Sequence, residues 1–163
     1  MKTLLIVSHS RTGGAAQMAQ AAANGARNAE GVSVISRDAA DTTPDDVLAA
    51  DAYLFCAPEN LAALSGAMKE FFDRTYYPAL DRINGRPYAA MICAGSDGQN
   101  ALRQMTRIVT GWRLREIAEP IIVITRAQTP EAILAPKTIS AADLQRCAAL
   151  GEALAAGLAI GVF

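Results

Sequence analysis

The segment from Ser8 to Ala15 has the residue types of a loop that binds a phosphate group. It lies between a short apolar run and an alanine-rich stretch with helical character, so backbone N–H groups at a helix start would point at the anion. Hydroxyl groups can donate further hydrogen bonds, and two adjacent glycines let the backbone come close to a ligand. The alternative is a glycine-containing turn that only caps a helix. The candidate phosphate-binding residues are Ser8, Ser10, Arg11, Thr12, Gly13, Gly14 and Ala15.

Two more loops that follow apolar runs could contact a flat heterocycle. After the third run, the backbone of Glu59 and Asn60 could hydrogen-bond to the edge of such a ring, and the alternative is an ordinary connection with Asn60 as a helix cap. After the fourth run, two glycines allow close approach, and the alternative is that Ser96 or Asp97 caps the next helix. The candidates in these two loops are Pro58, Glu59, Asn60, Leu61, Gly95, Ser96, Asp97 and Gly98.

Other site chemistries lack their residues in this sequence. No Gly-Lys-Ser/Thr follows the first loop and no G-x-G-x-x-G occurs, so neither a Walker motif nor a dinucleotide fingerprint is present. Cys56, Cys93 and Cys147 are widely spaced without a C-x-x-C pair, which argues against a zinc site and against a disulfide framework. The one histidine, His9, lies in the first loop and is not proposed as a general base. We therefore predict no metal ligands and no catalytic side chains.

Five apolar runs supply the strands that would position these loops. Most are continuous rather than alternating, as expected for strands that are buried on both faces of a parallel sheet. The runs are Thr3–Val7, Val32–Ile35, Ala52–Cys56, Tyr88–Cys93 and Pro120–Ile124. The segments with helical character are Ala15–Arg27, a short helix that Thr43 caps before Pro44, Ala62–Tyr77, Gln99–Trp112, and a last helix from Ser140 with Asp143 in its first turn.

Strand and helix alternate five times along the chain. Right-handed crossovers then place helices on both faces of one parallel sheet. We predict an α/β fold, a three-layer doubly wound five-stranded parallel sheet with the order 2-1-3-4-5, as a single domain over residues 1–163. In that order a ligand binds outside the carboxyl ends of the strands beside strand 1, which selects the loops after strands 1, 3 and 4.

The amino-acid composition limits which classes of partner the chain is expected to bind. Of the 163 residues 52% are hydrophobic and 19% charged, which argues against disorder, and the net charge of −1 favours neither a nucleic acid nor an anionic membrane as a partner. The most apolar stretch, Ala153–Phe163, is too short to span a bilayer. Free thiols suit a reducing compartment, so we expect a cytoplasmic location without a membrane partner.

Together the three loops resemble the flavodoxin-like superfamily, and within it the NAD(P)H-dependent FMN reductase and quinone reductase branch. The first loop resembles the pattern Ser/Thr-x-Thr-Gly-x-Thr at Ser10, Thr12 and Gly13, and it departs from that pattern at Ala15. The second resembles the reductase pattern of Pro-Glu-Tyr/Asn followed by Gly and Lys on the next helix, here Pro58, Glu59, Asn60, Gly66 and Lys69. The stretch Phe72–Pro78 and the third loop, Gly95–Gln99, also resemble members of this branch, and the likeness ends near Ile124.

The resemblance implies FMN as cofactor, held by all fifteen candidate residues, with NADH or NADPH as electron donor and a flavin, a quinone or another small molecule as acceptor. Tyr76, Tyr77 and Trp112 are candidates for the pocket or for a surface between two copies, and core packing is the alternative for each. Basic residues that could bind the phosphates of a nicotinamide dinucleotide are Arg11, Arg37, Arg126 and Lys137. A homo-oligomer, a one-electron carrier without its own substrate, and a flavodoxin-fold domain that lost FMN because of Ala15 remain open.

Overall fold

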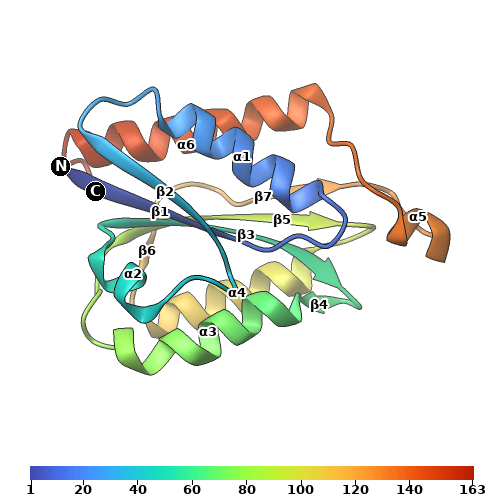
Figure 1. The fold of residues 1–163 in the computed structure, drawn as a ribbon, viewed down its shortest axis with the longest axis horizontal. Coiled ribbons are helices and arrows are strands. Elements are labelled where there is room, and N and C mark those ends of the chain that lie inside the picture. Colours follow the sequence, from blue (N-terminus) through green and yellow to red (C-terminus); the bar gives the residue numbers. More distant parts are fainter.

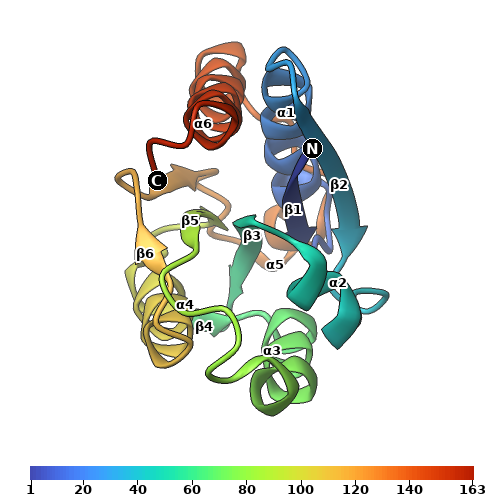
Figure 2. The ribbon, with the colours of Figure 1, turned by 90° about the vertical axis from the view of Figure 1, so that its left-hand side faces the viewer.

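The computed structural model describes all residues from 1 to 163 and consists of one twisted sheet between two layers of helices (Figure 1). Helices α1 and α6 cover one face, and α2, α3 and α4 cover the other (Figure 2). The helices span Gly14–Ala26 (α1), Pro44–Ala49 (α2), Gly66–Ala79 (α3), Gln99–Gly111 (α4), Pro130–Leu134 (α5) and Ala141–Ala159 (α6).

The strand order is the predicted one. The neighbours run β2-β1-β3-β5, with β6 and β7 both pairing with the far side of β5, and all of these pairs are parallel. Because β6 and β7 pair with successive parts of β5, they stand for one edge strand that is interrupted between them. The strands are Lys2–Ser8 (β1), Val32–Asp38 (β2), Ala52–Asn60 (β3), Ala63–Leu64 (β4), Pro87–Ala94 (β5), Arg115–Glu116 (β6) and Ile121–Ile124 (β7).

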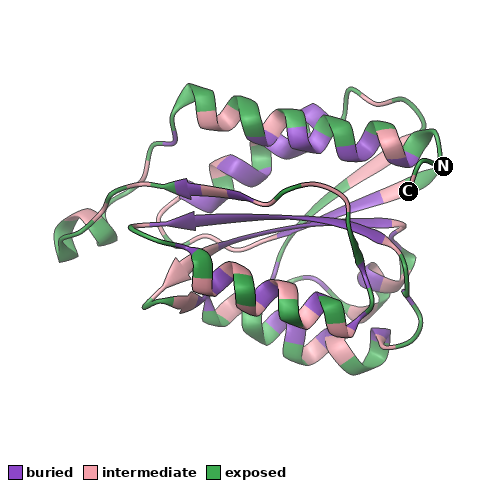
Figure 3. Cartoon of the chain, turned by 180° about the vertical axis from the view of Figure 1, so that it is seen from behind, coloured by how far each residue is buried: buried purple, intermediate pink, exposed green.

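The central strands are buried on both faces, which is why their runs are continuously apolar. All eight residues of β5 and the first six of β3 are buried, whereas the edge strand β2 contains no buried residue (Figure 3). The sheet separates two hydrophobic clusters, one beneath α1 and α6 and one beneath α3 and α4. This arrangement confirms the predicted doubly wound fold.

The hairpin after β3 differs from the prediction. Strand β3 continues through Asn60, and Asn60 pairs with Ala63 in the antiparallel strand β4, so the expected loop at 58–60 is a strand end. The predicted helix from Ala62 to Tyr77 is wrong at its start, because α3 begins only at Gly66. One two-residue antiparallel strand therefore accompanies the parallel sheet.

Helices α1 and α6 pack against each other at unusually short range. A Cβ atom on Gly25 would lie 2.0 Å from the Ala148 carbonyl oxygen, and one on Gly151 would lie 2.0 Å from the Ala22 carbonyl oxygen. The glycines thus let the two backbones touch. This close contact fixes the C-terminal half of α1 against α6.

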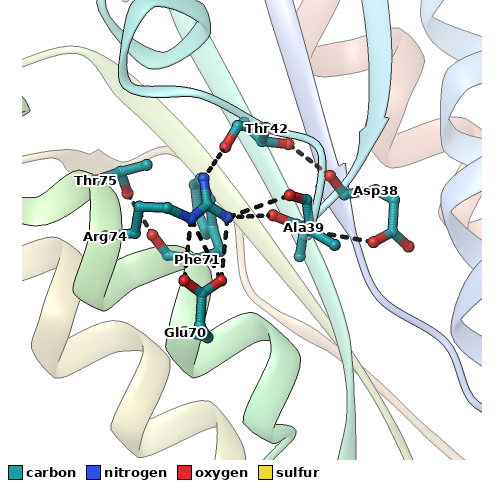
Figure 4. A network of polar contacts seen from close by, with 8 residues as sticks. Asp38, Ala39, Thr42, Glu70, Phe71, Arg74 and Thr75 are labelled. Atoms are coloured by element: carbon teal, nitrogen blue, oxygen red, sulfur yellow. Dashed lines mark hydrogen bonds and ion pairs between the residues drawn. The ribbon is translucent and has the colours of Figure 1, made fainter.

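Arg74 fixes α3 to the segment after β2 (Figure 4). The Arg74 guanidinium donates to the carbonyl oxygens of Thr42 and Ala39, and its Nε also donates to Glu70 at 3.0 Å. The neighbouring Tyr76 ring stacks on Trp112, whose indole N–H donates to the Tyr76 carbonyl oxygen at 2.9 Å. Both aromatic side chains therefore pack between α3 and α4 and do not lie at the loops that follow the strands.

Candidate active site

The loops after β1, β3, β5 and β7 meet outside the carboxyl ends of the strands and enclose a cavity of about 440 Å³. Eleven of the fifteen predicted binding residues line it: Ser10, Arg11, Thr12, Gly14, Ala15, Pro58, Glu59, Asn60, Leu61, Gly95 and Ser96. Four predicted residues do not. Ser8 ends β1, Gly13 and Gly98 are the N-caps of α1 and α4, and Asp97 is exposed beside Gly98.

The first loop leads into α1 with backbone N–H groups that no other group of the chain uses, and this arrangement, here called the cradle, is able to bind an anion. Ser10 Oγ accepts a hydrogen bond from the Gly13 N–H at 3.1 Å, and Gly13 takes a φ of 94°, which glycine adopts without strain. The N–H groups of Gly14 and Ala15 line the cavity side of the helix start and donate to no group of the chain. A Cβ on Gly14 would lie 2.6 Å from Cys93 Sγ, so only glycine fits against the sheet there.

His9 connects the first loop to the start of α3. Its Nδ1 lies 2.9 Å from Ser65 Oγ, which ties the loop to the residue before α3. Burial lowers the pKa of His9, Asp38 acts in the opposite direction and Arg11 lowers it further. The imidazole is therefore neutral at pH 7 and adds no positive charge to the site.

Glu59 lines the cavity, but its carboxylate is engaged in hydrogen bonds at the start of α4. Its carboxylate accepts hydrogen bonds from the N–H groups of Gly98 at 3.0 Å and Ala101 at 3.3 Å, and so caps α4. Asn100 and Gln104 on α4 bond to the backbone of Ala62 and Leu64, at 2.6 and 2.7 Å. The hairpin is thus clamped to α4, while its backbone stays at the cavity edge.

The turn between β3 and β4 carries backbone strain at the cavity mouth. Leu61 and Ala62 have φ values of 50° and 61°, which side chains larger than glycine rarely adopt. Two consecutive residues of this kind form the tight hairpin turn for which Asn-Gly is the usual sequence. The Leu61 side chain is fully exposed and apolar, at the rim of the cavity.

The third loop packs against the segment after β7. A Cβ on Gly95 would lie 2.8 Å from the Ala127 carbonyl oxygen, and one on Gly98 would lie 2.8 Å from Ile122. Thr125 connects the same two segments, since its N–H donates to the Ala94 carbonyl oxygen at 2.8 Å. Both glycines are therefore required by close packing.

The segment after β7 forms a wall of the cavity that the sequence did not reveal. It contributes Thr125, Ala127, Gln128, Ile133, Leu134 and Lys137. The short helix α5 is capped by Thr129, whose Oγ1 accepts from the Ala132 N–H at 3.2 Å. The predicted topology could have pointed here, because the loop after the fifth strand leaves the same edge of the sheet.

Two of the four basic candidates reach the cavity, namely Arg11 and Lys137. Arg37 instead pairs with Asp46 at 3.1 Å, and Arg126 is exposed outside the cavity lining.

The three cysteines have structural positions. All three are buried, and burial raises the pKa of the Cys93 thiol although Lys137 acts in the opposite direction, so Cys93 stays protonated at neutral pH.

Hydroxyls, free N–H groups and two cations gather at the first loop, and the apolar side chains of Leu61, Ile133 and Leu134 also line the cavity. Ile133 lies beside the first loop, because the Lys137 ammonium that donates to Thr12 Oγ1 also donates to the Ile133 carbonyl oxygen. No group of three His, Cys, Asp or Glu side chains is placed to hold a metal ion. None of the helices has the length and hydropathy needed to cross a membrane.

Comparison with known proteins places this arrangement in a family. The family model "NADPH-dependent FMN reductase" matches residues 35–129, more than half of the chain. The chain is 34% identical over 98 residues to a flavodoxin of Aquifex aeolicus, a match that covers 60% of this chain and 53% of the relative. It is 32% identical to an NAD(P)H dehydrogenase (quinone) of Acidithiobacillus ferrooxidans over 46% of this chain and 48% of the relative. The chain thus spans about half the length of the curated relatives it matches.

Solved structures agree with the fold. A flavodoxin from the domain Archaea superposes with a TM-score of 0.76 at 20% identity, covering 96% of this chain and 98% of that one. A WrbA-like flavodoxin of Agrobacterium tumefaciens superposes with a TM-score of 0.69 at 19% identity, covering 95% and 96%. With this flavodoxin-like fold and a family model matching more than half of its length, the chain belongs to the NADPH-dependent FMN reductase family.

Proposed function

We propose that this chain binds FMN in the cavity and uses it as an NAD(P)H-dependent oxidoreductase that reduces a small acceptor such as a flavin or a quinone. The observation that carries the proposal is the convergence of four loops on one cavity, whose first loop offers free N–H groups, hydroxyls and two cations to a phosphate. The family of the chain supports it.

The residues present fit FMN. The free N–H groups of Gly14 and Ala15 and the hydroxyls of Ser10 and Thr12 supply donors for a phosphate at the start of α1. The backbone of the hairpin at Asn60 and of the loop at Gly95 lines the opposite part of the cavity, where a flat ring with polar edges would be accommodated. FMN, when bound, supplies the hydride and single-electron chemistry.

The protein's own contribution is binding, orientation and control of access. The clamp of Glu59, Asn100 and Gln104 holds the hairpin backbone in one position, which favours a fixed placement of the ring edge. The exposed apolar side chains of Leu61, Ile133 and Leu134 border the cavity and offer apolar contacts to a ring that enters it. No side chain of the chain is needed as an acid or a base.

An open ring face favours a reductase over a carrier. The residues that line the cavity are small, polar or aliphatic, so no aromatic ring of this chain covers a flavin from either side. A nicotinamide and an acceptor could then use the same opening in turn, which predicts ping-pong kinetics. Covered ring faces would instead suit a protein that passes electrons only at its surface.

Anaerobic mixing of the FMN-loaded protein with NADH or NADPH tests the proposal. We expect rapid loss of the visible flavin absorbance and its return on addition of a quinone, with free FMN at the same concentration as the control. Binding of FMN without reduction by either nucleotide would favour the electron carrier. Absence of FMN binding would leave a flavodoxin-like domain without its cofactor and would contradict the proposal.

A further inference from the structure

Lys137 is the basic residue that is held most closely to the phosphate cradle. Its N–H donates to the Thr12 carbonyl oxygen at 2.8 Å, and its ammonium Nζ donates to Thr12 Oγ1 at 3.3 Å. The side chain is partly buried and lines the cavity. A charge at this position acts on an anion in the cradle with less screening by solvent than a charge on the open surface.

A glutamine from α1 locks this geometry. Gln17 Nε2 donates to the carbonyl oxygens of Gly13 at 2.9 Å and Lys137 at 2.7 Å, and Gln17 Oε1 accepts from the Ile139 N–H at 3.0 Å. One amide thus joins the first loop to the segment after α5. Lys137 is consequently positioned by the same element that presents the free N–H groups of the cradle.

No other charged side chain near the cradle is held against it as the Lys137 ammonium is. His9 is neutral at pH 7, Arg11 is exposed, and the Glu59 carboxylate is engaged at the start of α4. Ala15 offers no side-chain donor. Because Thr12 Oγ1 accepts from the Lys137 ammonium, the Thr12 hydroxyl proton remains free to donate toward an anion.

We propose that Lys137 is the residue by which this chain selects a flavin that carries a phosphate, so that it prefers FMN to riboflavin. The proposal rests on the proposed function and assigns one of its specificity-determining residues. The ammonium also donates to the carbonyl oxygens of Ile133 at 2.8 Å and Ala135 at 2.6 Å. A structural role as a clip for α5 is therefore the competing explanation, and the two differ in what they predict for riboflavin.

Binding of FMN and of riboflavin to the wild-type chain and to Lys137→Gln separates the two roles. The three N–H groups of the Lys137 ammonium are engaged by Thr12, Ile133 and Ala135, so its charge acts on the phosphate without a direct hydrogen bond. We expect FMN affinity to fall roughly 10-fold while riboflavin affinity is unchanged. The dependence of FMN affinity on salt concentration should also become weaker in the variant, because one cation fewer faces the phosphate. Lys137→Arg should restore most of the preference.

The control is Arg126→Gln, which removes the same charge from the same segment outside the cavity lining. It should leave the ratio of the two affinities unchanged. An equal loss of FMN and riboflavin binding in Lys137→Gln, or no change for either, would overturn the proposal. So would an unchanged FMN affinity with a raised KM for NADPH, which would assign Lys137 to the dinucleotide. In each of these cases FMN binding by the wild-type chain still stands, whereas a wild-type chain that binds no FMN overturns both proposals.

Discussion

At the scale of single residues, the sequence predicted which residues line the cavity better than it predicted where their side chains point. Glu59 was predicted to contact a ligand, and it does line the cavity, but its carboxylate caps α4. The partner, the N–H of Gly98, lies thirty-nine positions away, and no local pattern indicates such a bond. Lys137 was one of four basic candidates, and only its contact with Thr12 distinguishes it.

Replacement of Glu59 with Gln should destabilise the protein by about 1 kcal/mol, because the neutral amide interacts less favourably with the N–H groups and dipole at the start of α4. Urea denaturation of both proteins measures the difference. Glu30→Gln is the matched control, since Glu30 is exposed and its side chain makes no hydrogen bond. Equal midpoints for the two variants would show that Glu59 does not stabilise α4.

At the scale of elements, hydrophobic spacing predicted where helices and strands lie but not the hairpin after β3. Leu61, Leu64 and Met68 recur at helical spacing, which favoured a helix from Ala62. The pairing of β4 with β3 and the contacts with α4 prevail over that local preference. Helix α5 was missed because its five residues are too few for a periodic pattern.

The strained hairpin turn predicts that Ala62→Gly stabilises the protein. Glycine adopts the φ of 61° at this position without the steric cost that alanine incurs, and that cost is about 1 kcal/mol. Thermal unfolding followed by circular dichroism should give a higher midpoint, because the exposed Ala62 side chain contributes little packing that glycine would lose. A lower midpoint would show that the turn is not strained.

The contact between α1 and α6 predicts a large cost for Gly151→Ala. The new methyl group would lie 2.0 Å from the Ala22 carbonyl oxygen, so the helices must separate at a cost of about 1–3 kcal/mol. Chemical denaturation measures this loss. Gly66→Ala is the control, because a Cβ there meets no atom within 4 Å and should leave stability nearly unchanged.

At the scale of the whole molecule, the fold was predictable because its strands are buried on both faces and alternate regularly with helices. The order of strands then follows from right-handed crossovers, and the order places the loops after β1 and β3 side by side. The topology points to the segment after β7 as a neighbour of the site, but its contacts, such as that of Gln17 with Lys137 one hundred and twenty positions away, follow from no local pattern and were not predictable.

Stability should fall in acid as the carboxylates that tie the chain together are protonated. Burial raises the pKa of Asp51, but hydrogen bonds from the Thr3 N–H and Lys2, with the charges of Lys2 and Arg86, lower it more, so its pKa lies below the ordinary value. Its contribution is present above the unfolded-state pKa of about 4 and is lost as the pH falls through the lower folded-state pKa.

Asp51→Asn should therefore be less stable than the wild type at pH 7, and the difference should shrink as the solution is acidified. Thermal midpoints across the acid range measure it. Asp41→Asn is the control, since the Asp41 side chain is exposed and unpaired. A difference that is constant with pH would mean that the Asp51 charge is not responsible.

FMN binding at the first loop is tested by titrating the wild type and two variants at Gly13 with FMN, followed by quenching of flavin fluorescence. A Cβ at Gly13 meets only Gln17 Nε2, at 3.6 Å, and aspartate and asparagine have nearly the same size and share the same backbone strain at a φ of 94°. We expect saturable one-to-one binding by the wild type, weaker binding by Gly13→Asn, and none by Gly13→Asp, whose carboxylate would repel the phosphate. Equal FMN affinity for the two variants, or no saturable binding by the wild type, would contradict FMN binding at this loop.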